Sequence, residues 1–71
     1  MKPKKRIAEA LALCEDIATD LKQVEAYHAR RDPESCENVL SHISIVTLHE
    51  LREHVNELWS HYEKKFEGAR R

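Results

Sequence analysis

Between residues 4 and 67 the sequence contains one proline and no glycine, and this scarcity constrains the fold more than any other feature. Pro33 follows Asp32 near the middle of the sequence, the other proline is Pro3, and the single glycine is Gly68. Proline disfavours helical geometry in the residue before it, and aspartate is well suited to cap the helix that follows. The sequence therefore predicts two long helices, about 3–31 and about 33–67, joined by a very short turn at residue 32.

The first predicted helix carries apolar residues at alternating spacings of three and four, which is the pattern of a heptad seam. The seam consists of Ile7, Ala10, Cys14, Ile17, Leu21, Val24 and His28. Leu11 and Ala18 widen it on one side, which suits a helix in a bundle better than a narrow two-stranded coiled coil. Because so short a turn makes the second helix double back, we expect an all-α antiparallel helical hairpin.

The second half carries two apolar stripes, offset by about a quarter of a helical turn. The first contains Cys36, Val39 or Leu40, Ile43 and Val46, and the second contains Leu48, Leu51, Val55, Leu58, Tyr62 and Phe66. We expect one continuous helix whose stripes face different neighbours, because glycine and proline are absent between Pro33 and Gly68. The alternative is a three-helix bundle with a break near residues 44–47, where Thr47 and Glu50 fit a capping box.

The apolar surface exceeds what two helices can hide from each other. A chain of 71 residues buries a small fraction of its surface alone. We therefore expect two hairpins to form a homodimeric four-helix bundle, since one self-complementary interface covers both stripes. The predicted partner-binding residues are Ile43 and Val46, with Trp59 and Tyr62 as aromatic anchors.

Positive charge is concentrated at the two ends of a chain whose net charge is −1. Eight of the twelve basic residues are Lys2, Lys4, Lys5, Arg6, Lys64, Lys65, Arg70 and Arg71. An antiparallel hairpin brings both ends together, which predicts a basic pole containing Lys4, Lys5, Lys64 and Lys65. A nucleic-acid accessory protein using this pole is the alternative function, although solvated helix ends explain the same pattern and the net charge disfavours general nucleic-acid binding.

Histidines and carboxylates also recur along the second half. Glu50 and His54 lie one helical turn apart, as do Glu57 and His61. Such pairs are usually exposed and each stabilises a helix only slightly. If a dimer buried them, protonation of the histidines would make assembly depend on pH.

No catalytic residue, cofactor site or metal site is predicted. Local context places no Ser-His-Asp or Cys-His set, and one glycine leaves no phosphate-binding loop. Glu25 and His28 form the Glu-x-x-His step of carboxylate-bridged metal bundles, and Glu37 lies near them across the turn. A metal bundle built on these three residues is the third and least favoured hypothesis, because such sites need further ligands from facing helices.

Two cysteines, Cys14 and Cys36, are too few for a secreted disulfide framework and indicate a cytoplasmic protein. The turn separates them too far for an intrachain bridge, whereas an interchain bridge stays open. No apolar run is long enough to span a membrane. The sequence thus predicts one helical domain, residues 1–71, that is a small non-enzymatic interaction or regulatory module: an adaptor, inhibitor or subunit that binds itself and another protein.

Overall fold

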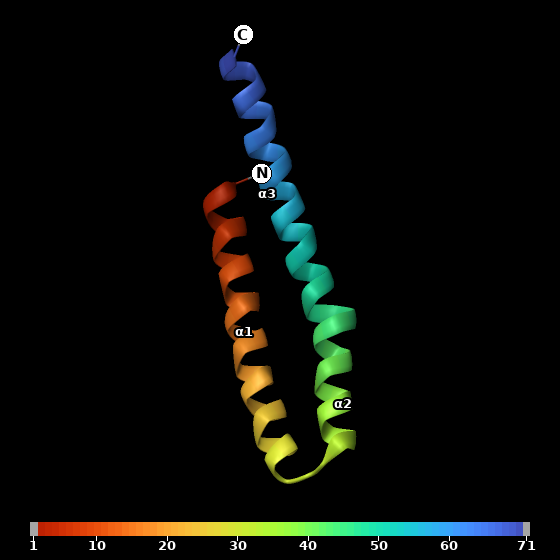
Figure 1. Ribbon diagram of the computed structural model, residues 1–71. Helices are drawn as coiled ribbons and strands as arrows, with labels where there is room; N and C mark the ends of the chain where they lie inside the picture. The colour runs from red at the N-terminus through yellow and green to blue at the C-terminus, as the bar shows by residue number, and fades with distance from the viewer. Residues whose placement is uncertain (1, 71) are drawn as a thin grey trace.

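The computed structural model describes the backbone of residues 2–70 and the side chains of residues 2–64. The elements follow in the order α1 (Pro3–Ala29), α2 (Pro33–His42), a π-helical segment η1 (Ile43–Thr47) and α3 (Leu48–Arg70). The two arms run antiparallel and side by side, and the molecule measures 58 × 17 × 16 Å (Figure 1). The expected all-α helical hairpin is therefore confirmed.

The second arm is one continuous helical path from the turn to the C-terminal end. The backbone stays right-handed helical at His42 (φ −62°, ψ −45°) and at Leu48 (φ −67°, ψ −33°), on either side of η1. The alternative of a break near residues 44–47 is therefore wrong. The β-branched residues of this segment weaken helix propensity, and the helix there instead widens by one residue into a π turn.

The π segment explains why the two apolar stripes of the second half differ in phase. The more buried positions recur at Val39, Ile43, Thr47 and Leu51, four residues apart, where α-helices alternate between three and four. One additional residue in the turn keeps the same side of the arm directed at α1 before and after η1. The quarter-turn offset between the two apolar stripes therefore reflects one additional residue in η1.

A Schellman motif ends α1 earlier than predicted, at Ala29 instead of residue 31. Arg31 adopts the left-handed conformation with φ 58°. The N–H of Asp32 donates to the carbonyl oxygen of Tyr27 at 3.0 Å, and that of Arg31 donates to the carbonyl oxygen of His28 at 3.0 Å. These two bonds satisfy the last carbonyl groups of α1 and turn the chain sharply.

Asp32 caps α2, as predicted. Its Oδ1 accepts a hydrogen bond from the N–H of Ser35 at 3.2 Å, and its Oδ2 accepts one from the Ser35 hydroxyl at 2.7 Å. The hydroxyl bond, the backbone bond and the nearby Arg30 charge hold the pKa of this carboxyl below its ordinary value, while burial opposes them. The turn thus starts the second arm with a charged cap.

Two contacts fix the register of the arms. Near the turn, the Cys36 thiol donates to the carbonyl oxygen of Val24 at 3.6 Å. At the open end, Arg6 lies beside His54. With equal rise along both arms, α1 begins at about the level of residue 57, so α3 continues alone for about 20 Å. Figure 1 shows this overhang, with the C-terminus well beyond the N-terminus.

Candidate interaction surface

The side of α1 that packs on the second arm follows a regular heptad spacing. Its half-buried residues are Pro3, Arg6, Ala10, Leu13, Ile17, Asp20, Val24 and Tyr27. Only Ala10, Ile17 and Val24 of the predicted seam are among them. The remaining four predicted seam residues, Ile7, Cys14, Leu21 and His28, are exposed. The inward side of α1 is therefore rotated away from the most apolar side of the helix.

This rotation leaves an apolar stripe on the outside of α1. The stripe consists of Ile7, Leu11, Cys14, Ala18 and Leu21, all exposed, and Leu11 retains 60 % of its accessible surface. Its residues alternate between spacings of four and three, which is the periodicity of a second packing seam. In the hairpin alone, that seam has no neighbour.

The second arm carries an equivalent stripe. Its exposed apolar members are Leu40, Leu48, Val55, Trp59 and Tyr62, of which Trp59 is 69 % exposed, and the exposed Ser44 and Arg52 interrupt it at equivalent positions. The inward residues of α3 are Leu51, His54, Leu58 and His61, each half-buried. Exposed and inward apolar residues therefore alternate along this arm as they do along α1.

The two stripes lie on the same face of the hairpin. Most stripe residues directly follow an inward-facing residue: Cys14 follows Leu13, and Val55 follows His54. One step along a helix turns about 100° in a fixed sense. Viewed from one end of the hairpin, the chain turns in opposite senses in two antiparallel helices. The residue that follows an inward-facing residue therefore lies on the same side of the hairpin in both arms. We call the combined surface of Ile7, Leu11, Cys14, Ala18, Leu21, Leu40, Leu48, Val55 and Tyr62 the apolar face.

The opposite face is polar and mainly acidic. Exposed residues that come directly before an inward-facing residue lie on this face. They include Glu9, Asp16 and Gln23 of α1, and Glu50, Glu53 and Glu57 of α3. His49 pairs with Glu53 through Nε2 and Oε1, 3.0 Å apart. The hairpin is thus two-sided, with one face suited to water and the other suited to a helical neighbour.

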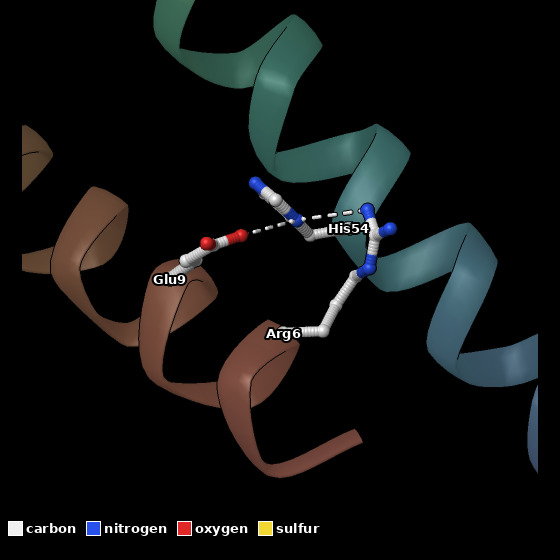
Figure 2. A network of polar contacts seen from close by, with 3 residues as sticks. All are labelled: Arg6, Glu9 and His54. Atoms are coloured by element: carbon white, nitrogen blue, oxygen red, sulfur yellow. Dashed lines mark hydrogen bonds and ion pairs between the residues drawn. The ribbon is translucent and has the colours of Figure 1, made fainter. Parts of the chain in front are cut away.

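A polar cluster of Arg6, Glu9 and His54 closes the open end of the hairpin (Figure 2). Arg6 Nη1 donates to His54 Nδ1 at 3.2 Å, and Glu9 Oε2 lies 3.6 Å from the same nitrogen. The His54 side chain is 19 % exposed and its ring points toward α1. The expectation of an exposed Glu50 and His54 pair is therefore corrected, because His54 binds across the hairpin.

The predicted partner-binding residues separate into three groups. Ile43 is 6 % exposed and is, with Thr47, one of the two buried residues among the described side chains. Its assignment to a partner surface is therefore corrected, because its own chain covers it. Trp59 and Tyr62 lie on or beside the apolar face. Val46 is exposed but precedes the inward Thr47, which places it on the opposite flank.

The predicted basic pole is divided by the overhang. Lys4 and Lys5 are exposed in the first turn of α1, and Lys64 is exposed in α3. Lys65 lies outside the described side chains. Lys64 is about 12 Å further along the axis than Lys4, so the two groups do not converge. A shallow hollow at the N-terminal end is lined by Lys2, Lys5, Arg6 and Glu9.

Neither metal coordination nor a disulfide organises the described residues. Among the side chains of residues 2–64, no group of three or more His, Cys, Asp or Glu residues is arranged to hold a metal ion. Glu25, His28 and Glu37 are exposed and are not brought together, so the hairpin does not support the carboxylate-bridged hypothesis. Cys14 and Cys36 are both free thiols.

The described part of the chain contains no helix with the length and apolar character needed to cross a bilayer. No family model, curated protein or solved structure matches this sequence. Functional inference therefore rests on the two-sided surface of the hairpin.

Proposed function

We propose that this chain is a small, non-enzymatic interaction module that associates with itself through the apolar face and then binds another protein. The single observation that supports it most is the extent of that face, which is unbroken from Ile7 to Leu21 on α1, recurs on the second arm, and carries exposed leucine, isoleucine, valine and tyrosine side chains. Isolated exposed apolar residues are ordinary, whereas a contiguous apolar patch marks an interaction site.

The energetics favour association. Full burial of one large aliphatic side chain contributes about 1.5–3 kcal/mol, and the apolar face holds several that are about half exposed. Only two described residues are buried within the hairpin itself. Two hairpins that pack face to face form a four-helix bundle, in which the present outer stripes become a second core.

A role as an adaptor, inhibitor or subunit fits a bundle of this kind. Once the apolar face is covered, the acidic faces remain available on the outside of the assembly. Trp59 directly follows the inward Leu58 and so lies on the covered side, where an aromatic residue is a common anchor in protein interfaces. The unpaired thiols agree with the reducing conditions of the cytoplasm.

The test is the solution mass by light scattering over a range of concentrations, with circular dichroism on the same samples. We expect a helical dimer for the wild type and a helical monomer for Val55→Glu, which places a charge in the apolar face. Asn56→Glu is the matched control, because Asn56 is an exposed neighbour outside that face and should leave the dimer intact. A helical wild-type monomer at every concentration would contradict the proposal.

Nucleic-acid binding remains the second candidate, supported by the exposed Lys4 and Lys5 beside the basic hollow at the N-terminal end. Its test is salt-dependent retention of DNA or RNA by the wild type and by a variant with charge reversal at Lys4, Lys5, Lys64 and Lys65. Loss of a salt-sensitive interaction only in the variant would favour this function.

A further inference from the structure

We infer that the occupant of the apolar face is a second copy whose α1 packs antiparallel on α1, about a two-fold axis beside Cys14. This inference rests on the proposed self-association and adds its arrangement. A two-fold axis across an antiparallel helix pair places each residue opposite the one equally far on the other side of the axis. The stripe of α1 is consistent with that symmetry.

The spacing of the α1 stripe is symmetric about Cys14. Ile7 lies seven residues before it and Leu21 seven residues after it. An axis beside Cys14 therefore sets Ile7 against Leu21 of the second copy, and the two Cys14 residues against each other. All three side chains are exposed in the hairpin and available for this contact.

Size and charge are complementary in the same register. Leu11 lies three residues before Cys14 and Ala18 lies four residues after it, so they face each other across the axis to within one residue, and a large side chain meets a small one, as interdigitated helix packing requires. Lys4, seven residues before Leu11, lies opposite Glu25, seven residues after Ala18. Both are exposed. The apolar contacts are thus bounded at each end by opposite charges.

The overhang of α3 supports this axis independently. With Lys4 opposite Glu25, the turn of the second copy extends past the start of α1 by about six residues, or about 9 Å. That extension lies beside the part of α3 that has no α1 neighbour, including Trp59 and Tyr62. A hollow at the turn, lined by His28, Arg31, Asp32, Pro33 and Cys36, lies at the end of the apolar face and faces Tyr62 of the second copy.

The competing arrangement places the two-fold axis along the helices, so that α1 packs on α3 of the second copy. Both overhangs then project from the same end, and neither is beside a turn. In that register Leu11 is level with residue 49, beside Leu48 of the second copy, and Lys4 is level with residue 56 and has no acidic residue opposite it. The axis across the helices therefore pairs Lys4 with Glu25 and places each overhang beside a turn, which the axis along the helices does not.

Disulfide trapping tests the axis directly. In a Cys36→Ser variant, Cys14 is the only thiol, and diamide accepts the two electrons and two protons released when two thiols form one disulfide. We expect covalent dimers on a non-reducing gel and by intact mass. The control is Ala8→Cys with both native cysteines replaced by serine, because Ala8 is exposed on the outer side of α1. Cross-linking through Cys14 should be roughly tenfold faster or more, since pre-positioned thiols react at high effective concentration.

Light scattering on the reduced samples separates the two levels of inference. A dimer that cross-links through residue 8 but not through Cys14 overturns the axis and leaves the proposed self-association standing. A monomer at every concentration overturns both. A dimer trapped through Cys14 supports both.

A charge swap provides the second measurement. Lys4→Glu places two acidic residues opposite each other and should raise the dimer Kd about fivefold. Adding Glu25→Lys restores opposite charges and should return the Kd toward the wild-type value. If the double variant dimerises no better than Lys4→Glu alone, the inferred pairing is incorrect.

Discussion

Arg6 donates a hydrogen bond to the imidazole of His54, from Nη1 to Nδ1 over 3.2 Å, across 48 residues of sequence. Together with the Cys36 thiol bonded to the Val24 carbonyl oxygen near the turn, this contact sets how far the arms are displaced along their axis. That displacement in turn sets the length of the overhang and, in the proposed dimer, the level of the second copy.

A double-mutant cycle measures the Arg6 and His54 contact. We expect Arg6→Ala and His54→Ala to couple by about 0.5–1.5 kcal/mol in urea unfolding, the range of a single partly buried hydrogen bond. The cycle of Lys5→Ala with His54→Ala is the control, since Lys5 is exposed on the neighbouring surface. A coupling no larger than that of the control would show that the contact does not fix the register.

The Asp32 cap predicts a specific loss of stability in acid. Its pKa is lowered in the folded chain, chiefly by the Ser35 hydroxyl bond. The charged cap therefore stabilises the fold above the ordinary aspartate pKa of about 3.9, and this contribution is lost as the pH falls through the lower folded value. Asp32→Asn keeps a capping side chain that does not titrate. Between neutral pH and about pH 2, thermal unfolding should show a larger fall in Tm for the wild type than for Asp32→Asn.

Arg31 is a site where the wild type is not optimal. Its φ of 58° lies in the left-handed region, where the side chain of an ordinary residue costs about 1 kcal/mol and glycine has no such penalty. Arg31→Gly should therefore raise the free energy of unfolding by up to about 1 kcal/mol. Arg30→Gly is the matched control and should not stabilise, because Arg30 is right-handed (φ −84°, ψ −2°). Equal effects from both substitutions would contradict the assignment of strain to Arg31.

Ile43 distinguishes the hairpin core from its surface. The side chain is 6 % exposed, so Ile43→Ala should lower the free energy of unfolding by about 2–4 kcal/mol through lost burial and a cavity. Circular dichroism and light scattering during urea titration should show that helicity and solution mass are lost together. Val55→Ala is the control on the apolar face, where dissociation into helical monomers is expected instead. A helical Ile43→Ala monomer of unchanged unfolding free energy would place Ile43 on the partner surface after all.

Sequence patterns were sufficient for the hairpin because helix signals and the proline boundary are local. Pro33 and Asp32 located the turn, and the heptad spacing indicated that α1 packs lengthwise. The rotation of α1 was not predictable from that spacing, since Ala10, Ile17 and Val24 lie between two candidate seams. Arg6, Asp20 and Tyr27 are half-buried on one side, while Ile7, Leu21 and His28 are exposed on the other. Apolar character alone ranks these sides in the wrong order for a single hairpin, and the proposed dimer would give the more apolar side a neighbour of its own.

The basic pole depended on an additional assumption, that the arms are equal in length. The second arm is longer by the overhang, so Lys4 and Lys64 are separated along the axis. The single hydrogen bond between Arg6 and His54 carries that information. A long-range contact of this type has no local signal. The unequal lengths of the two predicted helices were a sign of the overhang that the prediction of the basic pole did not use.

The π segment yields a prediction that runs against the usual cost of deleting a residue from a helix. Removal of Ile45, which is 70 % exposed, shortens η1 by the one residue that exceeds an α-helical turn. The spacing from Ile43 to Thr47 then becomes three, and Leu51, His54 and Leu58 continue the alternation of four and three with the same side inward. The deletion should therefore change the free energy of unfolding by less than about 1 kcal/mol.

Deletion of Asn56 is the matched control. Asn56 is also exposed, but it lies in the regular part of α3, where one lost residue rotates everything after it by about 100°. Leu58 and His61 would then leave the interface with α1, and the free energy of unfolding should fall more than after deletion of Ile45. Urea unfolding of both variants, with their helicity at neutral pH, provides the comparison. A loss of stability from the Ile45 deletion equal to that from the Asn56 deletion would mean that η1 does not hold the additional residue of the second arm.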